Sequence, residues 1–437
     1  MEYAVLGTFC AGLLLCIVMD ISIIYALLAG LLLFMLYGRR RGFSWYELTS
    51  MALNGVRTVR NILVTFVLIG IMTALWRMAG TIPFIVCHAT KLIRPSVFFL
   101  MTFLLNSALS FLTGTSFGTA ATMGVICASM GAAMKVSPML TGGAVLSGTF
   151  FGDRCSPVST SALLVATVTD TNIYDNIRHM MRGALIPFLM TCLIYVCFGT
   201  FPPSEGSAMD LETLFSGSFS LNWTTVLPAV AVLLLAVLRV DVKLAMGASI
   251  LTAIPICLLV QHAAPVDILR ASINGFSPQE AEAASLINGG GVVSMLKVGC
   301  IVCISSAYAD IFNQTGLLDG AKRAVAIISD KTNRFAAMLL SAIISGMIAC
   351  NQTLTILLSN QLCRDLYTDR VRLAVDLEDT AVVIAPLIPW SIAGAVPLAA
   401  TGAPTAAILT SFYLILLPVY RLVTATLGRK RNTKSAA

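Results

Sequence analysis

The segments NSALSFLTGTSFGTAATMG, residues 106–124, and GTFFGDRCSPVSTSALLVATVTDT, residues 148–171, decide the fold of this chain. Each belongs to a long apolar region that small and polar residues interrupt. Glycine and proline free backbone amides and carbonyls that lipid cannot satisfy, so such an interruption persists in a membrane only around a protein-lined or watery cavity. An acidic residue there is costly to bury and is therefore a functional candidate. We expect the two interruptions to form half of a transport site.

The composition places the chain in a membrane. Of its 437 residues, 57% are hydrophobic and 11% are charged, whereas a soluble domain has about 25% charged residues. Six uncharged runs are each near the roughly 17–25 residues of one helical crossing; they are residues 3–19, 21–38, 61–76, 183–204, 223–238 and 244–264. We predict an all-α polytopic protein of the inner or plasma membrane, with about 10–12 transmembrane helices, re-entrant hairpins and broken helices.

The second half of the chain repeats features of the first. The sequence around Asp20 in the first half resembles that around Asp241 in the second half. In the same way MALNGV resembles ASINGF, and LSFLTGTSFGT resembles ISGMIACNQTL. The offset between the paired segments is about 220–236 residues. Two weakly similar halves with interruptions in corresponding positions are typical of a secondary transporter that binds its substrate at the repeat interface. The predicted parts are a first membrane repeat (1–200), an extracytoplasmic linker (201–222), a second repeat (223–428) and a basic cytoplasmic tail (429–437).

Basic residues indicate that the two repeats are inverted. Three arginines at 39–41 and the basic tail mark the cytoplasmic side, whereas residues 201–222 contain three acids and no Lys or Arg. Residues 262–289, which correspond to the region of 39–41, carry one Arg and several acids and are predicted to lie outside. The net charge of +7 thus reflects orientation in membrane lipid, and no nucleic-acid partner is expected.

Asp153 is the leading candidate for chemistry, because it lies in an apolar context beside the helix breakers Gly152 and Pro157. A carboxylate there can bind either Na+ or a proton, since loss of hydration favours its neutral form and a nearby cation favours its ionised form. Hydroxyls and free carbonyls are suitable oxygen ligands for Na+, which makes Asp153, Ser156 and Thr115 the candidate ion ligands. The alternative is that adjacent Arg154 simply neutralises Asp153.

Further candidates come from the other polar interruptions. The interruption from Gly114 to Thr119 forms the predicted tip of a re-entrant hairpin, or alternatively a small-residue helix-packing face. The interruption from Asn351 to Thr353 could provide ligands or interhelical hydrogen bonds. Glu378 and Asp379 form a third group, which is either a proton or cation entry site or a solvated helix start. With the neighbours of Asp153, the candidate residues are Gly114, Thr115, Ser116, Thr119, Ser156, Ser159, Thr160, Asn351, Gln352, Thr353, Glu378 and Asp379.

Motifs of other functional classes are absent from the sequence. It contains no Walker-type phosphate loop, nucleophile elbow or HExxH. We therefore expect no enzymatic activity and no cofactor, and we expect energy to come from an ion gradient or a second solute rather than from ATP. A channel and a membrane enzyme are the alternatives from other classes; a channel would give conductance instead of saturable counterflow.

The chain resembles the NhaC family of Na+/H+ antiporters in the strings GTSFGTAATMGV, SGTFFGDRCSP, DNIRHM and EDTAVVIAPLIPWS. The resemblance covers most of the length, and the family's GTSxGT and GDxxSP correspond to residues 114–119 and 152–157. It implies an inverted-repeat transporter, a homodimer with a scaffold and a mobile transport domain. It also implies elevator-like alternating access that exchanges Na+ for H+. Some family members move malate against lactate, or amino acids, with these ions.

Two departures from the family pattern concern carboxylates. Thr160 and Ser161 stand where the family often has an acid followed by Thr, and Asn351 stands where many members have Asp before Gln. The loss of up to two carboxylates argues against a strict two-cation stoichiometry and leaves Asp153 as the main titrating candidate. It also favours the alternative function, a Na+- or H+-coupled exchanger of small organic acids or amino acids.

Overall fold

The computed structural model describes the backbone of most of the chain, namely residues 2–19, 21–200, 215, 217, 219–238, 240–278, 284, 287–315 and 333–435. The predicted linker therefore lies largely outside the described residues. Within them every regular element is a helix, and the only extended pairing is an isolated bridge between Phe276 and Gly289. The predicted all-α class is confirmed.

The first half begins with a helical hairpin and ends with a long helix. Between them lie a short amphipathic helix, an apolar helix and two interrupted regions. The elements are α1 (Glu2–Val18), α2 (Ile23–Arg40), α3 (Trp45–Thr58), α4 (Arg60–Met78), α5 (Thr81–Leu92), η1 (Pro95–Val97), α6 (Phe98–Thr113), α7 (Ser116–Thr119), the π-helical turn η2 (Ala120–Gly124), α8 (Val125–Ala133), α9 (Pro138–Cys155), α10 (Thr160–Thr169) and α11 (Ile173–Gly199).

The second half repeats this order of elements in the residues that the structure describes. Its last helix extends into the predicted basic tail as far as Ser435. The elements are η3 (Trp223–Val226), α13 (Leu227–Val237), α14 (Val242–Leu259), α15 (Pro265–Asn274), η4 (Val292–Met295), α17 (Leu296–Thr315), α19 (Arg334–Ala349), α20 (Gln352–Cys363), η5 (Arg364–Leu366), α21 (Arg370–Leu377), the π-helical turn η6 (Glu378–Val382), η7 (Ala385–Leu387), α22 (Ile392–Thr401), η8 (Thr405–Thr410) and α23 (Phe412–Ser435).

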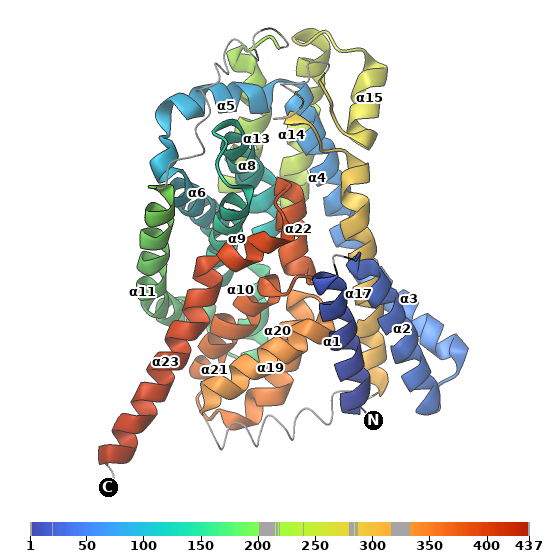
Figure 1. The fold of residues 1–437 in the computed structure, drawn as a ribbon, viewed down its shortest axis with the longest axis vertical. Helices are drawn as coiled ribbons and strands as arrows, with labels where there is room; N and C mark the ends of the chain where they lie inside the picture. The colour runs from blue at the N-terminus through green and yellow to red at the C-terminus, as the bar shows by residue number, and fades with distance from the viewer. Residues whose placement is uncertain are drawn as a thin grey trace.

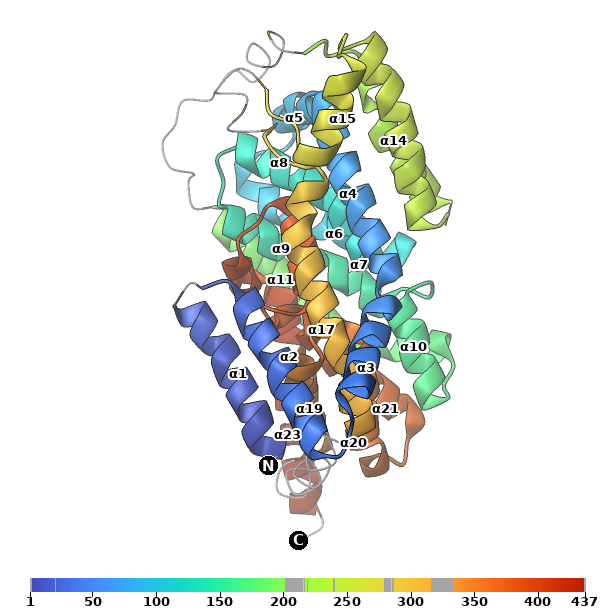
Figure 2. The same ribbon diagram turned by 90° about the vertical axis from the view of Figure 1, so that its right-hand side faces the viewer.

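The two halves interlock instead of forming separate bodies. Helix α17 of the second half packs along α2 and α3 of the first, and α4 of the first half packs against α14 and α15 of the second. Figures 1 and 2 show α17 beside α2 and α3 in both views. Each half thus supplies one long helix to the other. The inversion of the halves stays a prediction.

Several helices are long and apolar enough to cross a membrane. Among the described residues six pass by length and composition, and a seventh crossing is the pair Arg370–Leu387 and Ile392–Thr401, bent by 53°. Six shorter apolar helices of 10–17 residues accompany them. The chain is therefore a multi-pass membrane protein. The expected 10–12 crossings would require some of the shorter helices to span as well, and this number stays a prediction.

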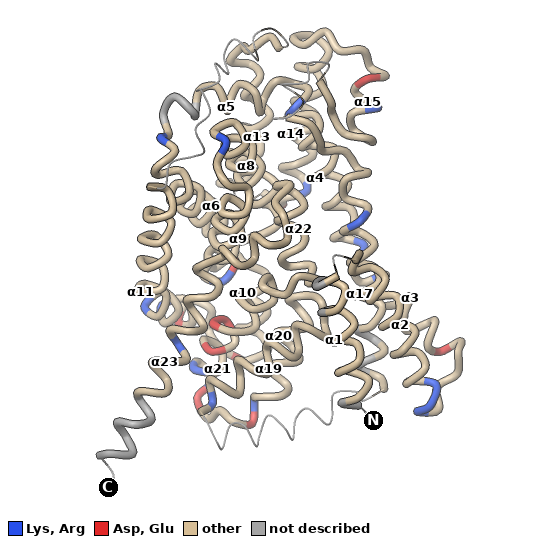
Figure 3. Tube along the Cα trace, in the orientation of Figure 1, with Lys and Arg blue, Asp and Glu red and all other residues tan. Residues whose placement is uncertain are grey.

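The elongated molecule carries both chain ends at its lower end in Figures 1 and 2. Basic residues also occur at that end, on the last turn of α2 and around α11, α21 and α23 (Figure 3). The positive-inside rule assigns such an end to the cytoplasm.

Glycines allow α9 to lie in the centre of the first half. An added Cβ at Gly152 would be 2.2 Å from the backbone of Ser110 and Phe111, and one at Gly148 would be 2.7 Å from Phe103 O. Helix α9 therefore approaches the backbone of α6 directly, as small residues permit in membrane helix pairs. This close packing fixes the position of the last turn of α9, which carries Asp153.

Candidate functional site

The first interruption of the first half is a left-handed turn. Helix α6 ends at Gly114, which has φ +65°, and Thr115 then caps α7 by accepting a hydrogen bond from the Gly118 amide at 3.2 Å. Only glycine adopts such a φ readily. A Cβ at Gly114 would also lie 2.6 Å from Val158 C. The tip of this turn thus rests on the second interruption, which supports a hairpin over a continuous packing face.

The second interruption separates α9 from α10. Helix α9 ends at Cys155, residues 156–158 are not helical, and Ser159 caps α10 by accepting from the Ala162 amide at 3.4 Å. Pro157 has no amide hydrogen to continue the helix. Asp153 therefore lies in the final turn of one helix and faces the start of the next.

The second half contains the same pair of interruptions. Helix α19 ends at Cys350 with φ +57°, and Asn351 caps α20 by accepting from the Leu354 amide at 2.9 Å. Ser391 likewise caps α22, and the Ile392 amide donates to the Cys350 carbonyl at 2.8 Å. In each half, then, the first interruption contacts the second.

Asp153 connects the interruptions of the two halves. Asp153 is only 3% exposed to solvent. One carboxylate oxygen accepts from Ser159 Oγ and the other from Gln352 Nε2, both at 3.0 Å, while Ser161 Oγ donates to the Asp153 backbone carbonyl at 3.3 Å. Gln352 also donates to the Val382 carbonyl at 3.4 Å. The amide of Gln352 thus makes the interhelical hydrogen bonds that were one of its two expected roles.

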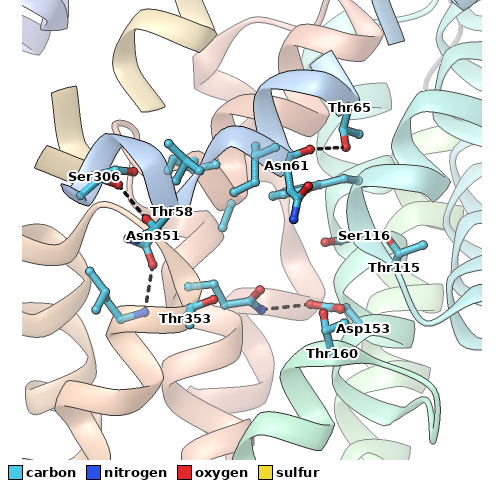
Figure 4. A pocket seen from close by; sticks show the side chains of 18 of the residues that line it. Thr58, Asn61, Thr65, Thr115, Ser116, Asp153, Thr160, Ser306, Asn351 and Thr353 are labelled. Carbon is cyan, nitrogen blue, oxygen red and sulfur yellow. Dashed lines mark hydrogen bonds between the residues drawn. The ribbon is translucent and has the colours of Figure 1, made fainter. Parts of the chain in front are cut away.

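A cavity of about 770 Å³ lies beside Asp153. Figure 4 shows Asp153 and Thr160 on one side, Thr115 and Ser116 above them, and Asn351 and Thr353 facing from the second half. Seven of the predicted site residues line this cavity, and they come from both halves: Thr115, Ser116, Asp153, Thr160, Asn351, Gln352 and Thr353.

The opposite wall was not expected from the sequence. Further lining residues are Asn54 and Thr58 of α3, Asn61 and Thr65 of α4, Ser306 of α17 and Lys243 of α14, and Figure 4 shows Thr58, Asn61, Thr65 and Ser306 on the side away from Thr160. The first four are spaced by four, three and four residues, which places them on one helical face. That polar stripe was a signal that could have identified them.

A buried ionic network lies behind Asp153. Arg154 is fully buried and pairs with Asp379, not with Asp153. Asp379 also pairs with Arg421 Nε at 2.6 Å, and Arg421 Nη2 pairs with Asp376 at 3.0 Å. Two arginines therefore neutralise Asp379, so the alternative that Arg154 neutralises Asp153 is wrong. The alternative of a solvated helix start at Glu378 and Asp379 is also wrong, because both are buried.

Glu378 differs from its neighbour Asp379. It is 1% exposed, and neither carboxylate oxygen has a hydrogen-bond partner among the described residues. It interacts electrostatically with Arg154, Asp153 and Asp379. A buried carboxylate without a hydrogen bond is costly unless it is neutral or compensated, which makes Glu378 a second candidate for protonation.

The remaining predicted residues do not line the cavity. Gly114 forms the left-handed turn, and the hydroxyl of Thr119 donates to the Thr115 carbonyl at 2.8 Å. Ser156 Oγ accepts from the Val158 amide at 3.3 Å, whereas Ser159 contacts Asp153. In the described part of the chain no three His, Cys, Asp or Glu side chains are grouped as a metal site. An ion in the cavity would therefore rely on one carboxylate with hydroxyl, amide and carbonyl oxygens.

Comparison with known proteins places the chain in a family. A sequence model described as the Na+/H+ antiporter family matches residues 1–171 and 151–428. The two matches together span nearly the whole chain and include every residue of the cavity.

Individual relatives are named as antiporters of several kinds. The Na+/H+ antiporter NhaC of Alkalihalophilus pseudofirmus is 28% identical, covering 91% of this chain and 88% of the relative. The malate-2H+/Na+-lactate antiporter of Bacillus subtilis is 26% identical over 89% of this chain and 85% of its own length. The arginine/ornithine antiporter ArcD of Halobacterium salinarum is 25% identical over 90% and 84%, respectively.

Proposed function

Because the chain belongs to the Na+/H+ antiporter family, we propose that it exchanges Na+ for H+, with the Asp153 carboxylate binding one of the two ions at a time. The observation that carries this proposal is the position of Asp153. Its carboxylate is nearly inaccessible to bulk solvent, yet it borders the cavity at which the interruptions of both halves converge.

The lining of the cavity suits a small hard cation. Hydroxyls of Thr115, Ser116 and Thr160 and the side chain of Asn351 provide neutral oxygens around the single carboxylate. The two hydrogen bonds that Asp153 accepts hold it in place and leave further lone pairs for an ion. A proton and Na+ each neutralise this carboxylate, so binding of one excludes the other. That competition couples the two fluxes.

The two neighbouring acids have different roles in this proposal. Asp379 pairs with Arg154 and Arg421 and maintains the packing behind the site. Glu378 makes no hydrogen bond to a described residue and is free to hold a proton. It serves as the entry point for protons behind Asp153.

Transport in this proposal is alternating access of the elevator type in a homodimer. The interrupted helices contact one another and move as one body. The polar stripe on α3 and α4 forms the wall along which this body moves. The moving body carries Asp153, and the site opens in turn to each side of the membrane.

The experiment is Na+-driven proton flux in proteoliposomes containing Asp153→Asn. Asparagine keeps the size of the side chain and a hydrogen-bond acceptor but cannot bind a proton or a cation as a charged ligand. We expect pH-dependent Na+ exchange to be abolished. Asp365→Asn, a change at an exposed aspartate of η5 that does not line the cavity, is the matched control and retains exchange. Wild-type exchange by Asp153→Asn would refute the role of Asp153.

A second candidate function is favoured by Lys243. It is the only basic side chain among the residues that line the cavity. A cation and a carboxylate in the lining of one cavity suit a solute with an acidic group, such as a small organic acid or an amino acid. The malate-2H+/Na+-lactate antiporter and the arginine/ornithine antiporter are 26% and 25% identical to this chain. In this alternative the solute carboxylate binds Lys243, and the cation binds Asp153.

Counterflow measurements separate the two functions. Vesicles are assayed with Na+ alone and with Na+ plus malate, lactate or amino acids. Saturable flux that requires the organic solute and is lost in Lys243→Gln supports the second function. Full Na+/H+ exchange in Lys243→Gln, without stimulation by any solute, supports the first.

A further inference from the structure

A second cavity, separate from the one beside Asp153, lies in the lower part of the molecule. It has a volume of about 650 Å³. Its walls are parts of α11, α21 and α23, and α11 packs against each of the other two (Figure 1). The lining residues are His179, Arg182, Gly183, Asp369, Val371, Arg372, Val375 and Arg421.

The pocket is lined by three arginines and one aspartate. Arg182 and Arg372 are exposed and make no ion pair with any described residue, and Arg421 brings a third guanidinium, with 27% side-chain exposure. The one acid of the wall, Asp369, caps α21 by accepting from the Val371 and Arg372 amides at 2.9 and 3.3 Å. Exposed guanidinium groups in the lining of one pocket suit the oxygens of a phosphate group.

The surface next to the pocket is apolar. Along α11, directly after Arg182, the exposed side chains are Leu185, Ile186, Leu189 and Leu193, each at least 48% exposed. Such an apolar face is more stable in contact with lipid acyl chains than in contact with water. The pocket therefore lies where the surface of α11 changes from charged to apolar, at the end of the molecule that carries the basic segments (Figure 3).

We infer that this pocket binds the phosphate headgroup of an anionic membrane lipid, with the acyl chains along the apolar face of α11. Basic pockets between transmembrane helices on the cytoplasmic side are suited to such headgroups. The arginines of the pocket bind the phosphate. The adjacent apolar side chains of α11 favour a lipid over free phosphate.

Lipid binding is connected to the interior through Arg421. This side chain faces the pocket and also pairs with Asp376 and Asp379, and Asp379 pairs with Arg154, the neighbour of Asp153. A phosphate near Arg421 competes with the two carboxylates for its guanidinium and so alters the packing behind Asp153. This regulatory consequence rests on the proposed exchange function; the binding site does not.

The test measures binding directly. The full-length protein in detergent is titrated with phosphatidylglycerol or with phosphatidylcholine, and bound lipid is counted by native mass spectrometry. The variant is the double change Arg182→Gln and Arg372→Gln, at exposed positions that leave the ion network intact. The control is Arg40→Gln, an exposed arginine at the end of α2 that does not line the pocket. A third arm adds inorganic phosphate to the lipid titration.

We expect the wild type and Arg40→Gln to prefer phosphatidylglycerol. The double variant should bind it about ten- to thirtyfold more weakly, as expected for the loss of two surface cations. Equal binding of the two lipids, or unchanged binding by the double variant, would overturn the site. Displacement of the lipid by millimolar inorganic phosphate would show a free-anion site and overturn the lipid assignment. Because the readout is binding, the result is independent of whether Na+ exchange is observed.

Discussion

Gln352 of α20 donates a hydrogen bond to the carboxylate of Asp153 in α9 at 3.0 Å, across 199 residues of sequence. Asp153 lies just before the second interruption of the first half, and Gln352 lies just after the first interruption of the second half. This contact is the point at which one half of the chain orients the main ionisable group of the other. Gln352 is therefore a positioning residue in the proposed mechanism.

Replacement of this donor tests the relationship. Gln352→Met keeps an unbranched side chain but removes the amide, so Asp153 retains only the Ser159 hydroxyl. Hydrogen bonds to charged groups contribute about 1.5–3 kcal/mol, so we expect Na+ exchange at limiting Na+ to fall about tenfold or more. The measurement is Na+-dependent proton flux in proteoliposomes at several Na+ concentrations.

The control for this change is Gln314→Met at an exposed position of α17. Its flux should match that of the wild type. Equal flux for Gln352→Met at every Na+ concentration would mean that the hydrogen bond has no part in ion binding.

The buried pair of Arg154 and Asp379 should matter more for stability than for ion binding. Asp379→Asn leaves a guanidinium without its main partner, and breaking a buried pair in this way costs about 3–5 kcal/mol. The double change Arg154→Met and Asp379→Leu removes both charges and should recover most of this loss. The apparent melting temperature in detergent checks both expectations; a double variant less stable than Asp379→Asn would contradict them.

Gly114 should be less tolerant of alanine than Gly402. Both have positive φ, +65° and +69°, but a Cβ at Gly402 meets nothing within 4 Å, whereas one at Gly114 clashes with Val158. Left-handed backbone costs an L-residue about 1–2 kcal/mol. Gly402→Ala should show that cost alone in its melting temperature. Gly114→Ala should show a larger loss of stability and also reduced exchange, because it separates the two interruptions; equal effects would exclude the packing contribution.

The stability of α3 should depend on pH through Glu47. Hydrogen bonds from the Ser44 amide and hydroxyl, at 2.7 and 2.8 Å, hold the pKa of Glu47 below its usual value of 4.5. A carboxyl whose folded pKa is lowered stabilises the helix above its unfolded pKa, and this contribution is lost as pH falls through the folded pKa. Hydrogen exchange of residues 45–58, corrected for intrinsic rates, should be faster in Glu47→Gln than in the wild type at pH 6. The difference should disappear as the pH falls through the lowered pKa of Glu47.

Local chemistry made the interruptions predictable. Gly114 and Pro157 mark helix breaks in the sequence, and both breaks occur in the structure. Cys350 was less evident, because its left-handed conformation is unusual for a residue with a Cβ. The interruption around it was located through the repeat, in which ISGMIACNQTL echoes LSFLTGTSFGT, and the structure shows that Thr115 and Asn351 cap corresponding helices.

The sequence by itself determined that this is an all-α membrane protein with helix breaks at corresponding places of two halves. Hydropathy, glycine and proline act within a few residues, so these features require no knowledge of the fold. Only the tertiary structure decided that Arg154 pairs with Asp379, 225 residues away, and that Ser159 rather than Ser156 contacts Asp153. It also decided that α3 and α4 complete the cavity. The partners of a buried charge depend on which helix faces meet, and packing between distant segments sets those faces.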